Sequence, residues 1–214
     1  MVMKREAIAD KGIWTGKKHY ILNVYDNEGV RYNEPQLKMM GIEAVRSSTP
    51  SSCRTNIKAA LKVIMQEGEV KLREFVDTFE KEFHELPFED IAFPRGCRNL
   101  VKYHDAADLF KKGTPIAVRG ALVYNDMLKQ KGLEKKVTMI HDGDKVKFSY
   151  MKLPNPTRQN VISVPASLDQ RLGLHQYVDY DKQFDKGFKE PIRTICTAIG
   201  WELDKRYTLD QFFG

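Results

Sequence analysis

The chain has 214 residues, of which 42% are hydrophobic and 30% charged, and its formal net charge is +6. These values are typical of a soluble globular protein that is large enough to bury a hydrophobic core without disulfides or structural metals. They exclude a transmembrane chain and a membrane partner, because no apolar run approaches the ~18 residues of a membrane-spanning helix.

The cysteines and histidines are scattered along the chain. Cys53, Cys97 and Cys196 are odd in number, far apart and without a CxxC pair, and the five histidines form no group. This pattern favours reduced, intracellular thiols and argues against a zinc site. The sequence therefore predicts neither metal ligands nor a cofactor held by this chain.

Basic residues concentrate in the middle of the chain. Residues 91–147 carry 12 Lys and Arg against 6 Asp and Glu, an excess equal to the net charge of the whole chain. A local basic excess favours a polyanionic partner, although lysines that only keep the surface solvated explain the same count.

Residues 1–46 are predicted to be rich in β-structure. Residues 18–26 alternate as a strand does, residues 26–29 form a turn, residues 30–32 return as a short strand, and residues 42–46 form another. The region is too small, and too apolar on one side only, to bury itself well, so we expect it to complete a sheet whose other strands come from elsewhere.

Two adjacent lysines, Lys17 and Lys18, follow Gly16 and lead into the first of these strands, with Tyr20 close behind. Lysine is depleted in strand interiors, so the pair needs a reason. The lysines either form a solvated, charged strand end, or they meet phosphate or a groove edge with Tyr20 as an amphipathic neighbour.

Two amphipathic helices are expected next. Thr49 and Pro50 suit the N-cap and the first helical position, apolar residues recur at helical spacing over 57–65, and Gly68 suits a helix end. The second helix is expected over residues 70–86, and its aromatic stripe is expected to pack in a core.

The segment after Thr114 contains Arg119, Gly120, Tyr124 and Asn125. Arg119 offers forked donors for a phosphate, Gly120 permits close backbone approach, and Tyr124 and Asn125 add neutral donors. A buried structural arginine with a solvated asparagine explains the same residues.

Short elements are predicted around this segment. A short polar helix is expected within residues 97–112, strands over 138–141 and 145–151, and a short apolar strand over 161–164. Asp142-Gly143-Asp144 is predicted to be the hairpin turn that joins strands 138–141 and 145–151. It is not expected to be a metal site, since Asp-Gly is a common turn sequence for backbone reasons alone.

Several of these stretches together resemble a known family. Gly16-Lys17-Lys18-His19-Tyr20 resembles the Lys-Lys-Arg-Tyr motif of family B DNA polymerases. Residues 12–16, 34–41 and 47–50 resemble the flanking sequence in the replicative polymerases of T-even-type bacteriophages. Residues 119–125 resemble the thumb signature of that family, in which an Arg-Gly pair is followed by Tyr-Asn.

The resemblance implies an α+β fold in three parts. Residues 1–46 would be the C-terminal, β-rich piece of the palm, residues 47–206 a mostly helical thumb with small β-hairpins, and residues 207–214 a tail that binds the sliding clamp. The implied DNA contacts are Lys17, Lys18, Tyr20, Arg119, Tyr124, Asn125, Lys186 and Lys189, and the implied clamp contacts are Leu209, Phe212 and Phe213.

Some residues depart from the family pattern. His19 replaces the usual arginine, and Glu190 precedes Pro191 where phage relatives carry lysine. The outline Tyr-x-Asp-x-Asp recurs at residues 177–181, but it follows the lysine motif rather than preceding it and leads into a helical pattern. We therefore expect Asp181 to cap the last helix and not to be catalytic.

The parts of the family's polymerases that are missing from this sequence indicate its partners. The carboxylates that hold Mg²⁺ in the assembled polymerase, the fingers helix and the exonuclease domain would all lie upstream, so the chain has no catalytic residue and is expected to be inactive alone. The implied partners are primer-template duplex DNA, a larger N-terminal polymerase chain and the sliding clamp, in the cytoplasm of the phage's host.

Three alternatives stay open at this point. The chain is either the smaller subunit of a split polymerase, which Met1 just ahead of a predicted palm strand favours, or a fragment of a longer one. It is otherwise a stand-alone basic nucleic-acid-binding module. The apolar tail either docks on the clamp or folds back on its own thumb.

Overall fold

The computed structural model describes residues 4–204, and these adopt an α+β fold, as the sequence predicted. The chain divides into two units that do not follow its order. The first unit takes the chain up to residue 46, residues 54–81 and the chain from residue 188 on, whereas the second takes residues 47–53 and 82–187. The functional boundaries between palm, thumb and tail are a separate matter and stay a prediction.

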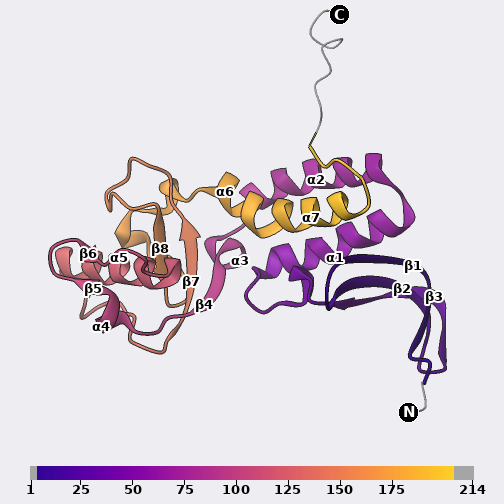
Figure 1. Ribbon diagram of the computed structural model, residues 1–214. Coiled ribbons are helices and arrows are strands. Elements are labelled where there is room, and N and C mark those ends of the chain that lie inside the picture. The colour runs from indigo at the N-terminus through magenta and orange to yellow at the C-terminus, as the bar shows by residue number, and fades with distance from the viewer. Residues whose placement is uncertain (1–3, 205–214) are drawn as a thin grey trace, which may run out of the picture. The chain divides into compact units, whose positions relative to one another are not determined.

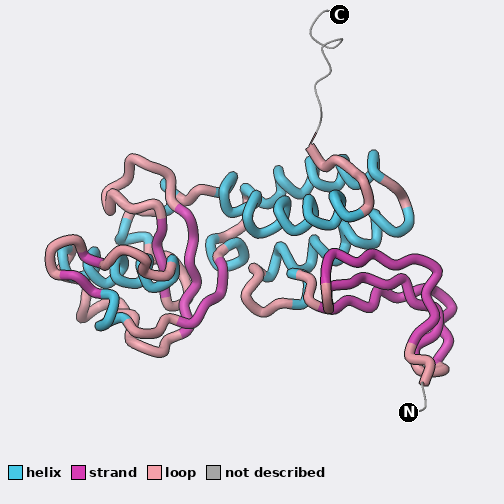
Figure 2. The backbone as a smooth tube through the Cα atoms, in the orientation of Figure 1, coloured by secondary structure: helices cyan, strands magenta, loops and turns pink. Residues whose placement is uncertain are grey.

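An antiparallel sheet begins the first unit. Strands β1 (Ala7–Gly16), β2 (His19–Asn27) and β3 (Val30–Met40) follow one another in sheet order, so β2 is central. Several residues of β2 are buried, whereas none of β3 is. Bulges interrupt the pairing of β2 with both neighbours, and Figure 2 shows the three strands bending together.

Three helices supply the rest of the first unit: α1 (Ser51–Gln66), α2 (Glu69–His84) and α7 (Glu190–Ala198). Figure 1 shows the sheet lying along α1, with α2 and α7 side by side. The predicted aromatic stripe does pack in the core, since Phe79 meets Phe188 edge-on with 4.8 Å between ring centroids. Ile21 of β2 and Ile57 of α1 are fully buried, so the apolar faces of sheet and helices form this core.

The second unit is built on another antiparallel sheet, in the order β4 (Phe93–Gly96), β7 (Lys145–Tyr150) and β8 (Val161–Val164). Helix α5 (Ile116–Gln130) packs against β8. The two approach most closely at Gly120, where a Cβ atom would lie 2.6 Å from the amide nitrogen of Ser163. The Ser163 hydroxyl donates a hydrogen bond to the carbonyl of Ala117 at 2.8 Å, which fixes helix and strand together.

The remaining described elements are short. They are the 3₁₀ turns Glu43–Val45, Gln170–Leu172 and His175–Tyr177, helices α3 (Phe88–Ile91), α4 (Leu100–Tyr103) and α6 (Tyr180–Phe184), the β5–β6 hairpin (His104–Asp105 with Leu109–Phe110) and a π-helical turn, Asp185–Lys189, that joins α6 to α7. Within residues 4–204, no helix combines the length and apolar character needed to cross a membrane.

Most of the predicted elements are confirmed, including both long helices, the strand over 161–164 and the helical pattern near the C-terminus. Residues 1–46 differ from the prediction. An additional strand, β1, and the continuation of β3 to Met40 give this region its own sheet, which packs on helices of the same chain. The predicted strand over 42–46 is wrong, because Arg46 N–H bonds the carbonyl of Glu43 and closes a 3₁₀ turn there.

Two further local predictions are wrong for identifiable reasons. Residues 138–141 do not form a strand, because the side chain of Asn125 bonds both backbone groups of Ile140 in place of a neighbouring strand. Asp181 does not cap a helix. The cap of α6 is Asp179, whose carboxylate accepts from Lys182 N–H at 3.1 Å, while Asp181 pairs with Lys152 at 3.3 Å.

Candidate nucleic-acid interface

The predicted lysine pair forms the tip of a hairpin. Gly16 pairs with His19, so Lys17 and Lys18 alone connect β1 to β2. Lys18 has φ 63°, an uncommon value for a residue with a side chain, and both lysines are exposed. Neither has an ion-pair partner among residues 4–204. The turn thus presents two free ammonium groups to solvent.

A glycine just after β3 supports this turn. Gly41 has φ 70°, and a Cβ atom there would lie 2.0 Å from the His19 ring and 2.7 Å from the carbonyl oxygen of Lys18. Any larger residue at position 41 would therefore displace the turn. His19, which replaces the family's arginine, rests against this glycine.

An apolar row crosses the sheet beside the turn. Trp14, Tyr20 and Met40 lie at paired positions on the three strands, and Trp14 is 64% exposed. Aromatic faces next to free cations suit a nucleic acid, whose bases and sugars are apolar and whose phosphates are charged. The sequence prediction included Tyr20 but missed Trp14 and Met40, which only the strand pairing brings beside it.

The three predicted DNA contacts on α5 differ in their surroundings. Tyr124 and Asn125 bond to backbone of the same unit, whereas Arg119 keeps unused donors. Tyr124 is 1% exposed and its hydroxyl donates to the carbonyl of Thr138 at 3.1 Å, while burial raises the pKa of its phenol. Asn125 accepts from Ile140 N–H at 2.9 Å and donates to its carbonyl at 2.7 Å. Both side chains therefore hold residues 138–140 onto the helix, and their DNA contacts stay a prediction.

Arg119 is placed differently. One guanidinium nitrogen donates to Asn160 Oδ1 at 2.9 Å, and the group lies 5.8 Å from the Phe110 ring centroid. Its Nε is buried without a partner among the described residues. Because an arginine has five N–H donors and one hydrogen bond accounts for one of them, Arg119 retains donors for an anion.

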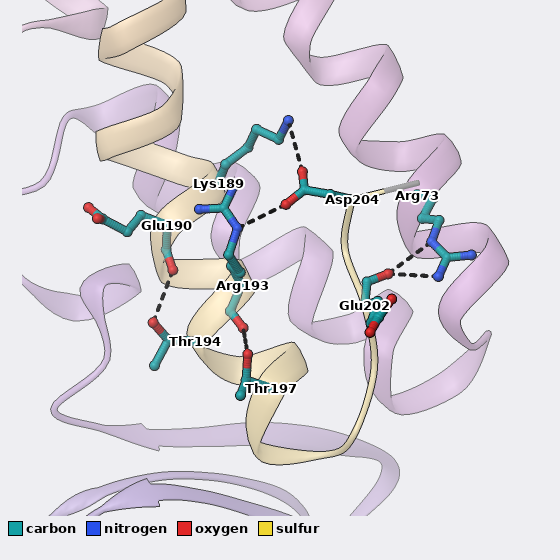
Figure 3. Close-up of polar contacts among 8 residues, drawn as sticks. All are labelled: Arg73, Lys189, Glu190, Arg193, Thr194, Thr197, Glu202 and Asp204. Atoms are coloured by element: carbon teal, nitrogen blue, oxygen red, sulfur yellow. Dashed lines mark hydrogen bonds and ion pairs between the residues drawn. The ribbon is translucent and has the colours of Figure 1, made fainter. Parts of the chain in front are cut away.

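Lys189, the residue before α7, belongs to a cluster of charges with Arg193 of α7 and Asp204 in the segment that follows the helix. Lys189 Nζ lies 3.5 Å and Arg193 Nε 3.1 Å from the two carboxylate oxygens of Asp204 (Figure 3). Arg193, with Lys189, holds the pKa of the Asp204 carboxyl below its ordinary value. Asp204 thus already pairs with both cations, and a DNA contact by Lys189 stays a prediction. Lys186, also predicted to bind DNA, lies exposed in the π-helical turn.

The segment carrying Asp204 is fixed by its backbone. Arg73 on α2 donates to the carbonyl of Glu202 at 2.7 and 3.0 Å (Figure 3). Glu202 N–H in turn donates to Glu69 at 3.0 Å. Arg73 and Glu69 also pair with each other. The predicted clamp contacts Leu209, Phe212 and Phe213 lie outside the described residues.

The acidic pairs that resemble catalytic sites serve the backbone. Asp144 accepts from His141 N–H at 2.7 Å within the turn, whereas Asp142 accepts from Leu100 N–H at 3.0 Å at the start of α4. Within residues 4–204, no three His, Cys, Asp or Glu side chains gather closely enough to hold a metal ion. The cysteines are buried, and burial raises the pKa of Cys53 to about 12, so its thiol is inert at neutral pH.

Comparison with known proteins found two similar polymerases and no matching family model. The chain is 34% identical over 227 residues to the DNA-directed DNA polymerase of Enterobacteria phage T4, and 35% identical over 225 residues to that of Escherichia phage RB69. Each match covers all of this chain but only 25% and 24% of the polymerase, respectively. The chain therefore spans about a quarter of the length of these curated relatives.

Proposed function

We propose that this chain is the palm-end and thumb portion of a DNA-directed DNA polymerase of T-even-type phages. The observation that carries the proposal is similarity to two such polymerases along the whole chain. The exposed Lys17-Lys18 turn beside Trp14 and Tyr20 supports it, because free cations next to aromatic faces suit duplex DNA.

In this function the chain grips DNA without reading its sequence. Lys18 contacts the primer end from the minor groove, where every base pair offers acceptors, and Arg119 and Lys189 contact phosphates of the duplex. Gly41 packs directly against the turn and so supports its position beside the sheet. Salt should weaken binding steeply, with a slope that counts the phosphates neutralised.

The chemistry belongs to a larger polypeptide. We assign the carboxylates and their Mg²⁺ ions to the remaining three-quarters of the enzyme, so the chain alone should not extend primers. A split enzyme and a fragment of one chain both require this partner, and the enzyme would act in the cytoplasm of the phage's host. The last residues, 207–214, would tether the assembly to a sliding clamp through Leu209, Phe212 and Phe213 and raise its effective concentration at the primer end.

Reconstitution tests the proposal. The chain is mixed with the polypeptide from the same source that corresponds to the remaining three-quarters of the relatives, and primer extension is measured. We expect extension only from the mixture, and tight complex formation by size-exclusion chromatography. Duplex binding by the chain without complex formation or extension would instead support a stand-alone nucleic-acid-binding module.

A further inference from the structure

Strand β3 leaves one edge of the first sheet unpaired. It bonds β2 along one side, and no other described strand pairs with it. Its eleven residues include none that is buried. Pro35 lies in the stretch between Arg31 and Gln36 where the pairing with β2 is interrupted, and it offers no N–H to a further strand. A long edge of this kind presents outward backbone donors and acceptors to any additional strand.

A groove runs between this edge and helix α1. Its volume is about 820 Å³. It is lined mainly by residues of the edge strand β3, among them Leu37 and Met39, and by Lys58, Lys62 and Met65 of α1, and it reaches Asn23 of the central strand β2. All of these residues belong to the first unit. The lining is therefore mixed, with an apolar part that favours side-chain burial and a basic part on the helix.

The two lysines lie one helical turn apart on the same face of α1. Both are exposed, and among residues 4–204 neither has an acidic partner, although Glu34 also lines the groove. Two free ammonium groups above an apolar lining favour an occupant that carries acidic as well as apolar side chains.

We propose that this groove docks an acidic, extended strand of the larger polymerase polypeptide, which adds to the edge of β3. The inference rests on the proposed function, which supplies the occupant: the relatives are about four times as long as this chain, so three-quarters of the enzyme must find a surface on it. Strand addition satisfies backbone groups on both sides, and pockets beside the edge give it specificity.

The chemistry of the edge favours protein over nucleic acid in this groove. A phosphate backbone offers only acceptors, so it could receive bonds from Lys58 and Lys62 but would leave the outward carbonyls of β3 without donors. A polypeptide strand supplies both donors and acceptors at the matching spacing. The apolar side chains of Leu37 and Met39, which also line the groove, gain nothing from contact with charged phosphates.

Hydrogen exchange locates the occupant. On mixing with the larger polypeptide, the outward-facing backbone amides within residues 34–39, Pro35 having none, should become protected, whereas addition of primer-template duplex to the chain alone should leave their exchange unchanged. Protection by the duplex would assign the groove to nucleic acid and overturn the inference.

A charge variant tests the lysines. Lys58→Gln with Lys62→Gln should weaken binding of the larger polypeptide about tenfold, and the matched pair Lys135→Gln with Lys136→Gln, also exposed, should leave it within about twofold. Thermal unfolding checks that both variants fold. Two outcomes overturn the inference but leave the proposed function standing. In one, the wild-type complex forms without protection within residues 34–39; in the other, both charge variants bind the larger polypeptide with equal affinity. Absence of any wild-type complex overturns both.

Discussion

Replacing Gly120 by alanine probes the closest contact in the second unit. In an exposed helix position this change would stabilise by about 1 kcal/mol, because alanine is the better helix former. Here the added Cβ would lie 2.4 Å from Ser163 Oγ, 2.6 Å from its amide nitrogen and 2.8 Å from the carbonyl carbon of Ile162. Two of these atoms are backbone of β8, so α5 and the strand must separate.

The cost follows from those atoms. Overpacking a core costs about 1–3 kcal/mol, and a rigid backbone neighbour puts Gly120→Ala at the upper end. Separation also strains the buried bond from Ser163 to the Ala117 carbonyl, for about 1 kcal/mol more. After the gain in helix propensity, we expect a net loss of roughly 2–3 kcal/mol, which lowers the unfolding midpoint by at least about 4 °C.

Thermal unfolding followed by circular dichroism measures this loss, with Gly96→Ala as the matched control. Gly96 lies in β4 of the same unit and has an ordinary φ, and nothing lies within 4 Å of a Cβ built there, so its midpoint should change little or rise. Adding Ser163→Ala to Gly120→Ala should restore stability only in part, because the backbone contacts remain. A Gly120→Ala protein at least as stable as the control would refute this account of the contact.

Further substitutions test the proposed DNA contacts. Lys18→Ala should slow primer extension by the assembled enzyme about tenfold in single-turnover assays, as expected for one charge-assisted hydrogen bond, with clamp binding unchanged. Arg119→Ala should reduce the salt slope of duplex affinity by about one, measured by fluorescence anisotropy. Asp204→Asn should raise duplex affinity about two- to fivefold, because it releases Arg193 and Lys189 from an exposed ion pair. Unchanged affinity would show that these two cations do not contact DNA. Deleting residues 209–214 should abolish clamp-stimulated synthesis while distributive synthesis and the unfolding midpoint persist; loss of folding instead would mean that the tail belongs to the thumb core.

The elements that the sequence predicted well are those that carry their own local signals. Helix α1 has proline before its first turn, apolar residues at helical spacing and Gly68, with φ 100°, just beyond its end. Strand β8 is a short apolar run with all four residues buried. In each case neighbouring residues along the chain determine the structure, so the pattern suffices.

The failures come from contacts that the local pattern does not contain. Strand β1 lacks a clean alternation because bulges shift its register, so only pairing with β2 identifies it. Residues 138–141 have strand-like side chains, yet Asn125, more than ten residues away, takes the backbone bonds of Ile140. Asp179 and Asp181 are equally good capping residues by type, and the position where α6 begins decides between them.

The candidate site shows the same division. Lys17 and Lys18 could be recognised from sequence because a lysine pair beside a strand is uncommon in itself. Trp14 and Met40 join them only through the register of three strands. The groove residues Lys58 and Lys62 carry no motif at all, since two lysines four apart on a helix are ordinary until an unpaired strand edge faces them.

The chemistry of the two proposed ligands would explain how one basic chain binds both DNA and a second polypeptide. At the hairpin turn, the ammonium groups lie at the tip of the sheet beyond the last paired residues, Gly16 and His19, and an acceptor-only phosphate backbone suits them. Beside β3, ammonium groups accompany unpaired carbonyls, which phosphate cannot satisfy and which a polypeptide strand can. The hydrogen-bonding groups that surround each lysine pair, rather than the charge itself, therefore distinguish a DNA contact from a subunit contact.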